Sequence, residues 1–224
     1  GDLVAHSLGC EPLTSFSHAN RTLLFDIRSE TWSPRLLEWA GLDAAQLPRP
    51  VASGTIAGVI APAVADLLGL PKGVQVVVGG HDQCCNCLGA GISDAGRAVC
   101  GMGTVECITP VYDHIPDSRE MLACGLNVEH HVLPNLYVSF IYNQSGALVR
   151  WFRDTFAGAE RKGLAPGEDL YERLMAEMPP EPTRLLVLPH FEITGAPDFI
   201  SDSAGVMAGL RTSTSRGEIL KAIL

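Results

Sequence analysis

The sequence lacks the features that mark membrane, secreted and nucleic-acid-binding proteins. No apolar run approaches the roughly 20 residues that a helix needs to cross a bilayer. No basic start followed by an apolar core marks a secretory signal at the amino terminus. Acidic residues dominate, with 25 Asp and Glu against 16 Lys and Arg and a net charge of −9. A general nucleic-acid surface needs a basic face to neutralise phosphates, so we expect neither a nucleic-acid nor a membrane partner.

An initiating methionine is also absent, and neither end shows a helix boundary. The chain opens on a helical pattern at residues 2–5 and closes on another at residues 218–224, with no stop signal. We therefore expect a segment of a longer chain, cut at both ends. A length of 224 residues suffices for one large or two small domains. A hydrophobic content of 46% and a mean hydropathy of +0.18 indicate a globular core.

The seven cysteines are odd in number, and several lie in apolar runs, which favours reduced, buried thiols in a cytosolic protein over a disulfide framework. Cys84 and Cys87 have the C-x-x-C spacing and follow His81, so a small zinc-binding module is one alternative. A structural zinc site needs four ligands. The other nearby cluster, His130 and His131, would point to opposite faces of a strand. Packing of small thiols between a helix and a sheet is therefore favoured.

Residues 76–83 form the stretch around which the chain is organised. Three valines at 76–78 predict a short buried strand, which Gly79 and Gly80 end. A helix is predicted to start in the run of small residues at Cys84. Asp82 would then lie at the carboxyl end of a buried strand, where open α/β sheets bind ligands. Asp is also a favoured N-cap residue, so helix capping by Asp82 is an equal alternative on the local pattern.

Strands and helices alternate along the rest of the chain. One predicted helix has clear boundaries, with Ser33 as its N-cap, Pro34 at its first position and Gly41 as its stop. Apolar spacing in residues 145–156 predicts another helix, with Trp151 and Phe152 in the core. Further helices are predicted at 61–70 and 170–178, and strands at 55–60, 98–104, 105–111 and 184–189. Two α/β units that share a cleft are expected.

A second glycine-rich turn ends the predicted strand 98–104. Such turns expose backbone N–H groups, and the hydroxyl of Thr104 adds a donor, so Gly103 and Thr104 suit phosphate oxygens. A hairpin turn with no ligand is the favoured interpretation when the segment is considered alone.

Five motifs occur along the chain in the same order as in a known family. They lie at residues 14–27 with Trp32, 79–83 with 88–91, 103–104, 145–147 with 151–154, and 188–205 with 209–210. Together they are similar to the FGGY carbohydrate kinases, a group that includes glycerol kinase, xylulokinase and gluconokinase. The resemblance implies an α/β fold, the truncated two-domain fold of the sugar kinase, Hsp70 and actin superfamily (ribonuclease H-like). Residues 1–95 would be the C-terminal part of the sugar-binding N-terminal domain, and 96–224 the N-terminal part of the nucleotide-binding C-terminal domain.

The resemblance implies a role for each matched residue. Asp82 would act as the general base that takes the proton from the sugar or polyol hydroxyl, as phosphoryl transfer from ATP requires. Gln83 would bind a substrate hydroxyl. His81 stands where many members have Gly, so it would reach the sugar or support the turn.

The nucleotide side would be formed by residues farther along the chain. Gly103 and Thr104 would meet the ATP phosphates, Gly146 would lie beside the nucleotide, and Arg150 would take a nucleotide-side position. ATP and Mg²⁺ are the implied co-substrate and metal, and no local ligand cluster marks a metal site. A homodimer is a further expectation from the family.

Several departures from the family pattern bear on substrate and activity. Ser15 replaces a common Asp, the loop 190–197 lacks the usual Gly-Glu-Arg triplet, and Ser203 replaces an Arg. The first phosphate loop, the first sugar-contact segment and the adenosine motif are absent from these 224 residues, so we expect negligible kinase activity from this chain alone. A non-catalytic sugar-binding regulator of the same fold is the alternative to a kinase, although a pure binding module would not need Asp82.

Overall fold

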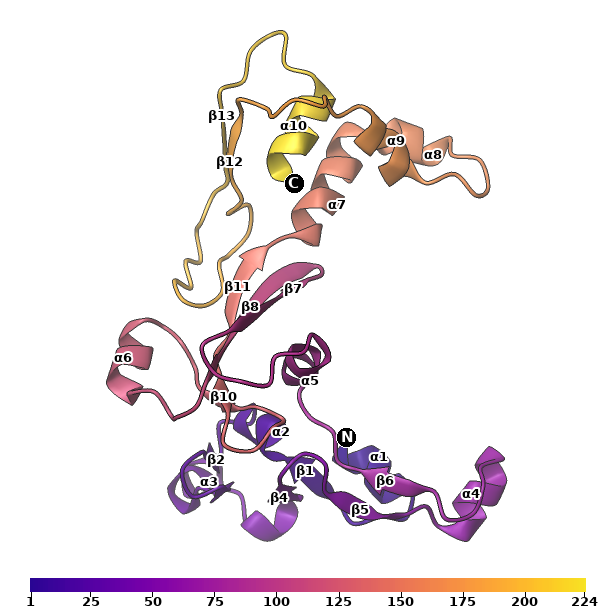
Figure 1. The fold of residues 1–224 in the computed structure, drawn as a ribbon, viewed down its shortest axis with the longest axis vertical. Coiled ribbons are helices and arrows are strands. Elements are labelled where there is room, and N and C mark those ends of the chain that lie inside the picture. The colour runs from indigo at the N-terminus through magenta and orange to yellow at the C-terminus, as the bar shows by residue number, and fades with distance from the viewer. The chain divides into compact units, whose positions relative to one another are not determined.

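The computed structural model describes residues 1–224, which divide into two compact units. Unit 1 contains residues 1–99 and 109–140, and unit 2 contains residues 100–108 and 141–224. Figure 1 follows the chain from its indigo N-terminus to its yellow C-terminus. None of the helices combines the length and the apolar composition that a membrane span requires.

Unit 1 is built from short helices and strands. Its helices are α1 (Asp2–Ser7), α2 (Phe16–Asn20), α3 (Pro34–Ala40), the 3₁₀ turn η1 (Ala44–Gln46), α4 (Pro62–Leu68), α5 (Asp82–Gly89) and α6 (Ser118–Ala123). Its strands are β1 (Leu13–Ser15), β2 (Phe25–Asp26), β3 (Thr31–Trp32), β4 (Arg49–Val51), β5 (Ile56–Val59), β6 (Gln75–Val77), β9 (Glu129–His130) and β10 (Tyr137–Val138).

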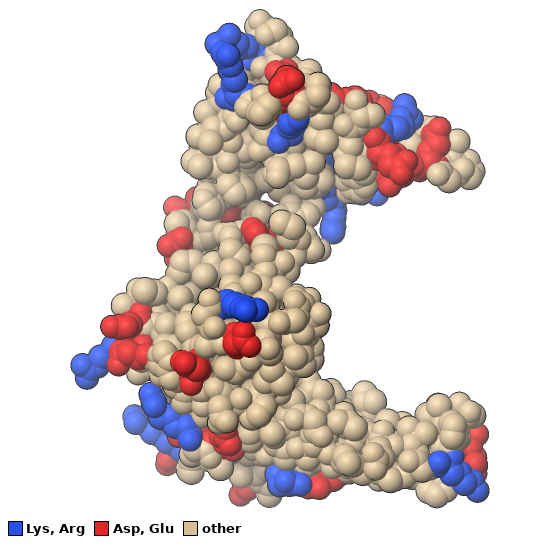
Figure 2. Space-filling view, in the orientation of Figure 1, with Lys and Arg blue, Asp and Glu red and all other residues tan.

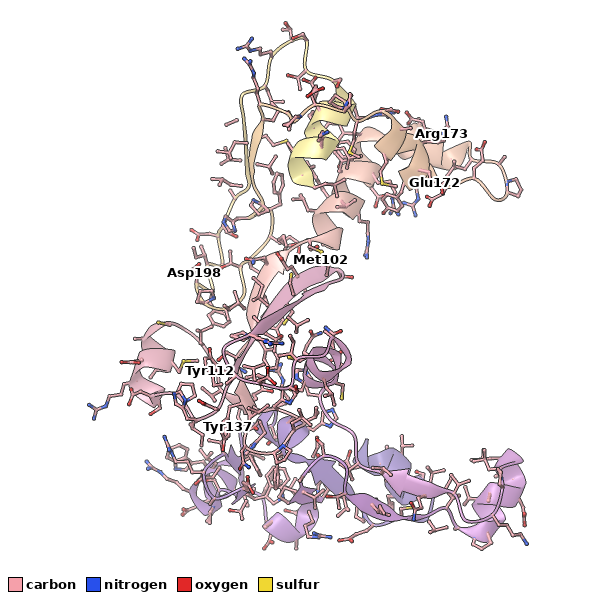
Figure 3. The ribbon with its side chains drawn as sticks, viewed as in Figure 1. Met102, Tyr112, Tyr137, Glu172, Arg173 and Asp198 are labelled. Carbon is pink, nitrogen blue, oxygen red and sulfur yellow. The ribbon has the colours of Figure 1, made fainter.

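Two strands each contain residues of both units. Strand β7 (Ala98–Met102) turns directly into β8 (Val105–Tyr112), and the two strands pair. The second half of β8 belongs to unit 1 and pairs antiparallel with β10, placing Tyr112 opposite Tyr137, both labelled in Figure 3. Strand β10 in turn pairs antiparallel with β9, so residues 129–138 form a hairpin.

The strand before Asp82 is less buried than the three valines predict. Strand β6 pairs antiparallel with β5 and with no other strand, and the side chain of Val77 is 52% exposed. The expectation of a fully buried strand is therefore wrong for this chain, because one edge and one face of β6 have no neighbouring strand. Only β1 and β4 pair in parallel, so Asp82 does not follow a parallel strand in these residues.

Helix α3 confirms the predicted boundary signals. The Ser33 hydroxyl accepts the backbone N–H of Leu36, Pro34 is the first helical residue, and Gly41 adopts a left-handed conformation with φ of 67°. Leu37 faces a small core with Ala19, Phe25 and Trp32. A second core in unit 1 contains Ala5, Cys10, Leu13, Val51 and Ala57.

Unit 2 consists of two strand pairs and a helical cluster. Its elements are β11 (Ile141–Gln144), α7 (Gly146–Phe156), α8 (Gly158–Lys162), α9 (Leu170–Ala176), β12 (Leu186–Leu188), β13 (Val206–Ala208) and α10 (Arg216–Ile223). Strand β11 pairs antiparallel with the first half of β8, and β12 pairs antiparallel with β13. The core contains Phe152, Ala157, Leu170, Leu174 and Leu220.

One of the two predicted core aromatics of α7 is confirmed. Phe152 is fully buried, whereas Trp151 is 36% exposed and contacts Phe156 and Phe191. Adjacent helical residues lie about 100° apart around the axis, so the two side chains cannot both face one narrow core. The expectation that Trp151 is a core residue is therefore wrong.

Ion pairs join the helices of unit 2. Nη1 of Arg216 lies 2.6 Å from Oε1 of Glu160, and the same guanidinium binds Glu177. Arg161 binds Asp154 at 2.8 Å. Figure 2 shows acidic and basic side chains side by side over α8 and α9. The charges on this part of the unit are therefore largely paired.

Candidate functional site

The Asp82 carboxylate projects from the first residue of α5. His81 occupies the N-cap position, so Asp82 is not the capping residue, and its side chain is 84% exposed. Oδ1 of Asp82 accepts the backbone N–H of Gln83 at 2.8 Å and lies 3.2 Å from Nε2 of His81. One carboxylate oxygen is thus held by the protein, while Oδ2 is left to meet another molecule.

Buried serines fix the turn that leads to Asp82. The hydroxyl of Ser17 accepts the backbone N–H of His81 at 3.0 Å and lies 3.1 Å from the hydroxyl of Ser15. Both serines are fully buried. A Cβ on Gly80 would collide with Val132 and lie 3.0 Å from the Ser17 hydroxyl. Glycine is therefore required at position 80 by close packing, whereas a Cβ on Gly79 would meet nothing within 4 Å.

Replacement of Ser17 by Ala is expected to lower the free energy of unfolding by about 1–3 kcal/mol, because the inward-facing N–H of His81 loses its acceptor. Urea unfolding of the full chain measures this change. The control is Ser29→Ala, since Ser29 is exposed and bonds only to nearby residues, and its effect should stay within about 0.5 kcal/mol. Equal effects of the two substitutions would contradict a structural role for the Ser17 hydroxyl.

A buried carboxylate lies behind His81. The side chain of Glu129 is 4% exposed, and its Oε1 accepts from Nη1 of Arg21 at 2.7 Å and from Nδ2 of Asn127 at 2.6 Å. Burial raises the pKa of Glu129, and the hydrogen bonds from Arg21 and Asn127 oppose that rise. Oε2 of Glu129 lies 3.7 Å from Nδ1 of His81. Sequence reasoning missed Glu129, because no local motif marks it and it is distant from Asp82 along the chain.

His81 is held in place by rings and by burial. Its side chain is 16% exposed and stands edge-on to Phe140, with ring centroids 5.1 Å apart. Burial lowers the pKa of His81, and the positive charge of Arg21 acts in the same direction. Gln83 is half-buried, and its Oε1 makes no hydrogen bond within the protein. His81, Asp82 and Gln83 are therefore placed together at the start of α5.

The cysteines near Asp82 pack rather than converge on a metal. Cys84 and Cys87 are fully buried on one face of α5, and the Cys84 thiol lies 3.5 Å from the carbonyl oxygen of His130. Burial strongly raises the pKa of the Cys84 thiol. No group of three or more His, Cys, Asp or Glu side chains is placed to hold a metal ion. Of the seven thiols, four are buried and three are exposed, so the expectation of buried thiols holds only in part.

The second glycine turn is the tip of a hairpin in unit 2. Met102, labelled in Figure 3, ends β7, and the N–H of Gly103 donates to the carbonyl of Val105 at 3.0 Å. The carbonyls of Gly103 and Thr104 accept the N–H groups of Gly146 and Ala147, both at 2.9 Å. The structure therefore brings Gly103, Thr104 and Gly146 together at the start of α7.

The contact between the turn and α7 requires a glycine. A Cβ on Gly146 would lie 2.5 Å from the carbonyl oxygen of Gly103, closer than van der Waals contact permits. Thr104 is exposed at the tip, so its hydroxyl is available to a ligand. Arg150 follows Gly146 by four residues on α7 and is exposed, which places it about one turn farther along the helix.

A cavity elsewhere in unit 1 does not contain the predicted catalytic group. It has a volume of about 600 Å³, and Ser15, His18 and Gly79 contribute to its lining together with apolar side chains. Asp82 is not among the lining residues. Cavity volume alone therefore does not identify the site around Asp82.

Comparison with known proteins decides the family. Residues 2–89 match the family described as "FGGY family of carbohydrate kinases, N-terminal domain". The chain belongs to the FGGY family. It is 37% identical over 194 residues to the autoinducer-2 kinase of Escherichia coli K12, a match that covers 80% of this chain and 34% of that protein. The corresponding Klebsiella pneumoniae protein is 35% identical over 183 residues, covering 79% of this chain and 33% of that protein. The FGGY chain thus spans about a third of the length of these curated relatives.

Solved structures show the fold. A xylulose kinase from Brucella ovis has a TM-score of 0.78 at 20% identity, over 99% of this chain and 44% of that chain. Plasmodium falciparum glycerol kinase with ADP has a TM-score of 0.76 at 22% identity, over 99% of this chain and 42% of that chain. The FGGY chain therefore has part of the sugar kinase, Hsp70 and actin fold, as the motifs predict.

Proposed function

We propose that the FGGY protein carrying these residues transfers the γ-phosphoryl group of ATP to a hydroxyl of a sugar or polyol, with Asp82 as the general base. One observation carries the proposal. Asp82 presents an unoccupied carboxylate oxygen at the start of α5 while its other oxygen is held by Gln83 and faces His81. Phosphoryl transfer needs little more from the protein than positioning, charge stabilisation and a group that accepts the hydroxyl proton.

The substrate side of the proposal rests on the neighbours of Asp82. The amide oxygen of Gln83 is buried and has no partner in the protein, which leaves an acceptor beside Asp82 for a sugar hydroxyl. His81 is the third member of the proposed substrate site, although most of its side chain is covered. Curated relatives are named autoinducer-2 kinases, so that compound belongs in a substrate panel beside polyols, ketoses and aldonic acids.

The nucleotide side is proposed at the hairpin tip of unit 2. The carbonyls of Gly103 and Thr104 consume the first N–H groups of α7. The N–H of Gly103 donates to Val105, so phosphate oxygens would be met at this turn by the Thr104 hydroxyl. Gly146 packs closely against that turn, and the Arg150 side chain carries a positive charge on the same helix.

Mg²⁺ accompanies ATP in this class of reaction, where it neutralises charge on the phosphates. Mg²⁺ is usually bound through one or two carboxylates and substrate phosphates, so we assign the ion to the phosphates of the nucleotide.

The domain assignment, the cellular location and the oligomeric state belong to the same proposal. Residues 1–95 are assigned to the FGGY N-terminal domain and residues 96–224 to its C-terminal domain. A cytosolic location and a homodimer accord with the family. Because the chain spans about a third of its curated relatives, we expect residues 1–224 alone to show negligible turnover.

The experiment that tests the function uses the full-length protein that carries residues 1–224, here called the full chain. It follows ADP release with ATP, Mg²⁺ and the panel of sugars, polyols, aldonic acids and autoinducer-2. Turnover with one compound class, above the rate without a sugar, supports the kinase. A folded protein that binds ATP and a sugar but releases no ADP would contradict it and favour a sugar-binding regulator.

A further inference from the structure

Two buried polar atoms without a partner face each other behind Asp82. Oε2 of Glu129 and Nδ1 of His81 each make no hydrogen bond within the protein, and they lie 3.7 Å apart. Unsatisfied polar atoms are rare in protein interiors because each costs free energy. Their separation is only slightly longer than a hydrogen bond, and hydrogen bonds of catalytic groups are often long in the absence of substrate.

Together with Asp82, the side chains of Glu129 and His81 form a row of three neighbouring groups. Nε2, the other ring nitrogen of His81, lies 3.2 Å from Oδ1 of Asp82. Glu129 comes from β9, and His81 and Asp82 come from the start of α5, all within unit 1. The arrangement is a carboxyl group, an imidazole and a second carboxyl group, of which only the last is exposed.

Neighbouring side chains fix the inner two members. Arg21 and Asn127 both bind Oε1 of Glu129, which directs Oε2 toward the imidazole. Phe140 packs against the His81 ring at 89°, and the ring of His18 approaches it from α2 with centroids 6.4 Å apart. The imidazole therefore has little freedom to turn away from Asp82.

We propose that Glu129 and His81 share one proton between Oε2 and Nδ1, which keeps a hydrogen on Nε2 of His81 and so positions the Asp82 carboxylate for the substrate hydroxyl. This inference rests on the proposed function in taking Asp82 as the general base. His81 and Glu129 are positioning residues, because they act through Asp82. Gln83 and His81 then hold Oδ1, and Oδ2 alone receives the proton.

The opposite tautomer conflicts with the geometry. A hydrogen on Nδ1 alone would leave a lone pair on Nε2 facing Oδ1 of an ionised Asp82, an acceptor against an acceptor. The charged and titratable groups that face the ring are Asp82, Glu129, Arg21 and His18. Burial raises the pKa of Glu129 and lowers that of His81, and both directions favour a proton held between them.

The proton balance of the reaction is simple. The hydroxyl proton passes to Oδ2 of Asp82 while the hydroxyl oxygen forms its bond to the γ-phosphorus. The bond between that phosphorus and the bridging oxygen of ADP breaks, and ADP keeps the electron pair. The shared proton stays between Glu129 and His81, and Asp82 later releases its new proton to water.

Nitrogen-15 NMR of the full chain, labelled at histidine, tests the shared proton without requiring activity. The His81 signals are identified by their loss in His81→Phe. We expect a hydrogen on Nε2 between pH 6 and 8, retained in Glu129→Gln because the amide N–H can donate to Nδ1. A ring protonated at Nδ1 alone would overturn the inference, whether or not the protein is a kinase.

Steady-state kinetics test the positioning role. His81→Phe should lower kcat about 10- to 100-fold with the KM for the sugar changed less than twofold, because a misplaced base slows chemistry rather than binding. A raised sugar KM with unchanged kcat would overturn the inference in favour of a contact between His81 and the sugar.

A neighbouring buried histidine provides the matched control. His130 is 5% exposed, and its Nε2 lies 3.2 Å from the carbonyl oxygen of Ile27, away from Asp82. His130→Phe should keep both kcat and the KM for the sugar within about twofold. Equal losses of kcat in His130→Phe and His81→Phe would overturn the inference. Absence of turnover in the unmodified full-length protein would instead refute the proposed function and leave the NMR result to decide the shared proton.

Discussion

Replacement of Asp82 by Asn is expected to lower the kcat of the full chain about 100- to 10,000-fold with its preferred sugar. An amide of the same shape still accepts from the backbone N–H of Gln83 but cannot take the proton of the attacking hydroxyl. Because the side chain is 84% exposed, the substitution should not disturb folding. ADP release measured across sugar and ATP concentrations should show the loss in kcat.

Asp66 supplies the control for this substitution. It is also exposed and helical, on α4 of the same unit, and it has no assigned role. Asp66→Asn should retain kcat within about twofold, in keeping with an ordinary surface substitution. Comparable turnover in Asp82→Asn and the unmodified chain would remove Asp82 from the reaction.

The second large effect is expected at Gly146, where Ala should lower kcat/KM for ATP about 10- to 100-fold. The new methyl group would lie 2.5 Å from the carbonyl oxygen of Gly103 and 3.6 Å from Cα of Thr104. The obstacle is backbone, so the turn that is proposed to meet the phosphates has to move. Titration of ATP in the ADP-release assay, with sugar saturating, measures the effect.

Gly158 offers a matched substitution in the same unit. A Cβ there would meet nothing within 4 Å, and Gly158 is the first residue of α8. Gly158→Ala should leave kcat/KM for ATP unchanged and should not destabilise the protein, because Ala is the better helix former. If the Gly146→Ala protein also keeps its kcat/KM for ATP, the hairpin tip is not a nucleotide contact.

Local signals in the sequence were sufficient wherever local chemistry determines the structure. Helix α3 begins after Ser33 and ends before Gly41 because a hydroxyl cap and a left-handed glycine satisfy its end groups without help from distant residues. The order of the FGGY motifs predicted the family for the same reason, since each motif is a continuous stretch. Helix α2 was not predicted, because its five residues are too few to show a helical apolar period and Phe16 is the only large apolar residue among them.

Burial could be predicted less well than element type. Three consecutive valines predicted a strand, and β6 exists, but its exposure depends on which strands pair with it. The position of Trp151 likewise depends on which face of α7 meets α9 and α10, and that face includes Phe152 instead.

The residues of the site also differ in whether the sequence predicts them. His81, Asp82 and Gln83 were predicted together because they are adjacent in the sequence. Glu129 was not, because its contacts with Arg21 and His81 join three segments that are far apart along the chain. Such a contact follows from tertiary packing, and a single sequence carries no local sign of it.

Because some thiols are exposed and others are buried, chemical labelling of the thiols can report the folded state of the protein. Cys85, Cys100 and Cys124 are exposed, whereas Cys10, Cys84, Cys87 and Cys107 are buried. A maleimide added to the native protein should therefore modify three sites within residues 1–224, and the remaining four only as the chain opens. Mass spectrometry of the labelled peptides would then report opening around α5 separately from opening around β8.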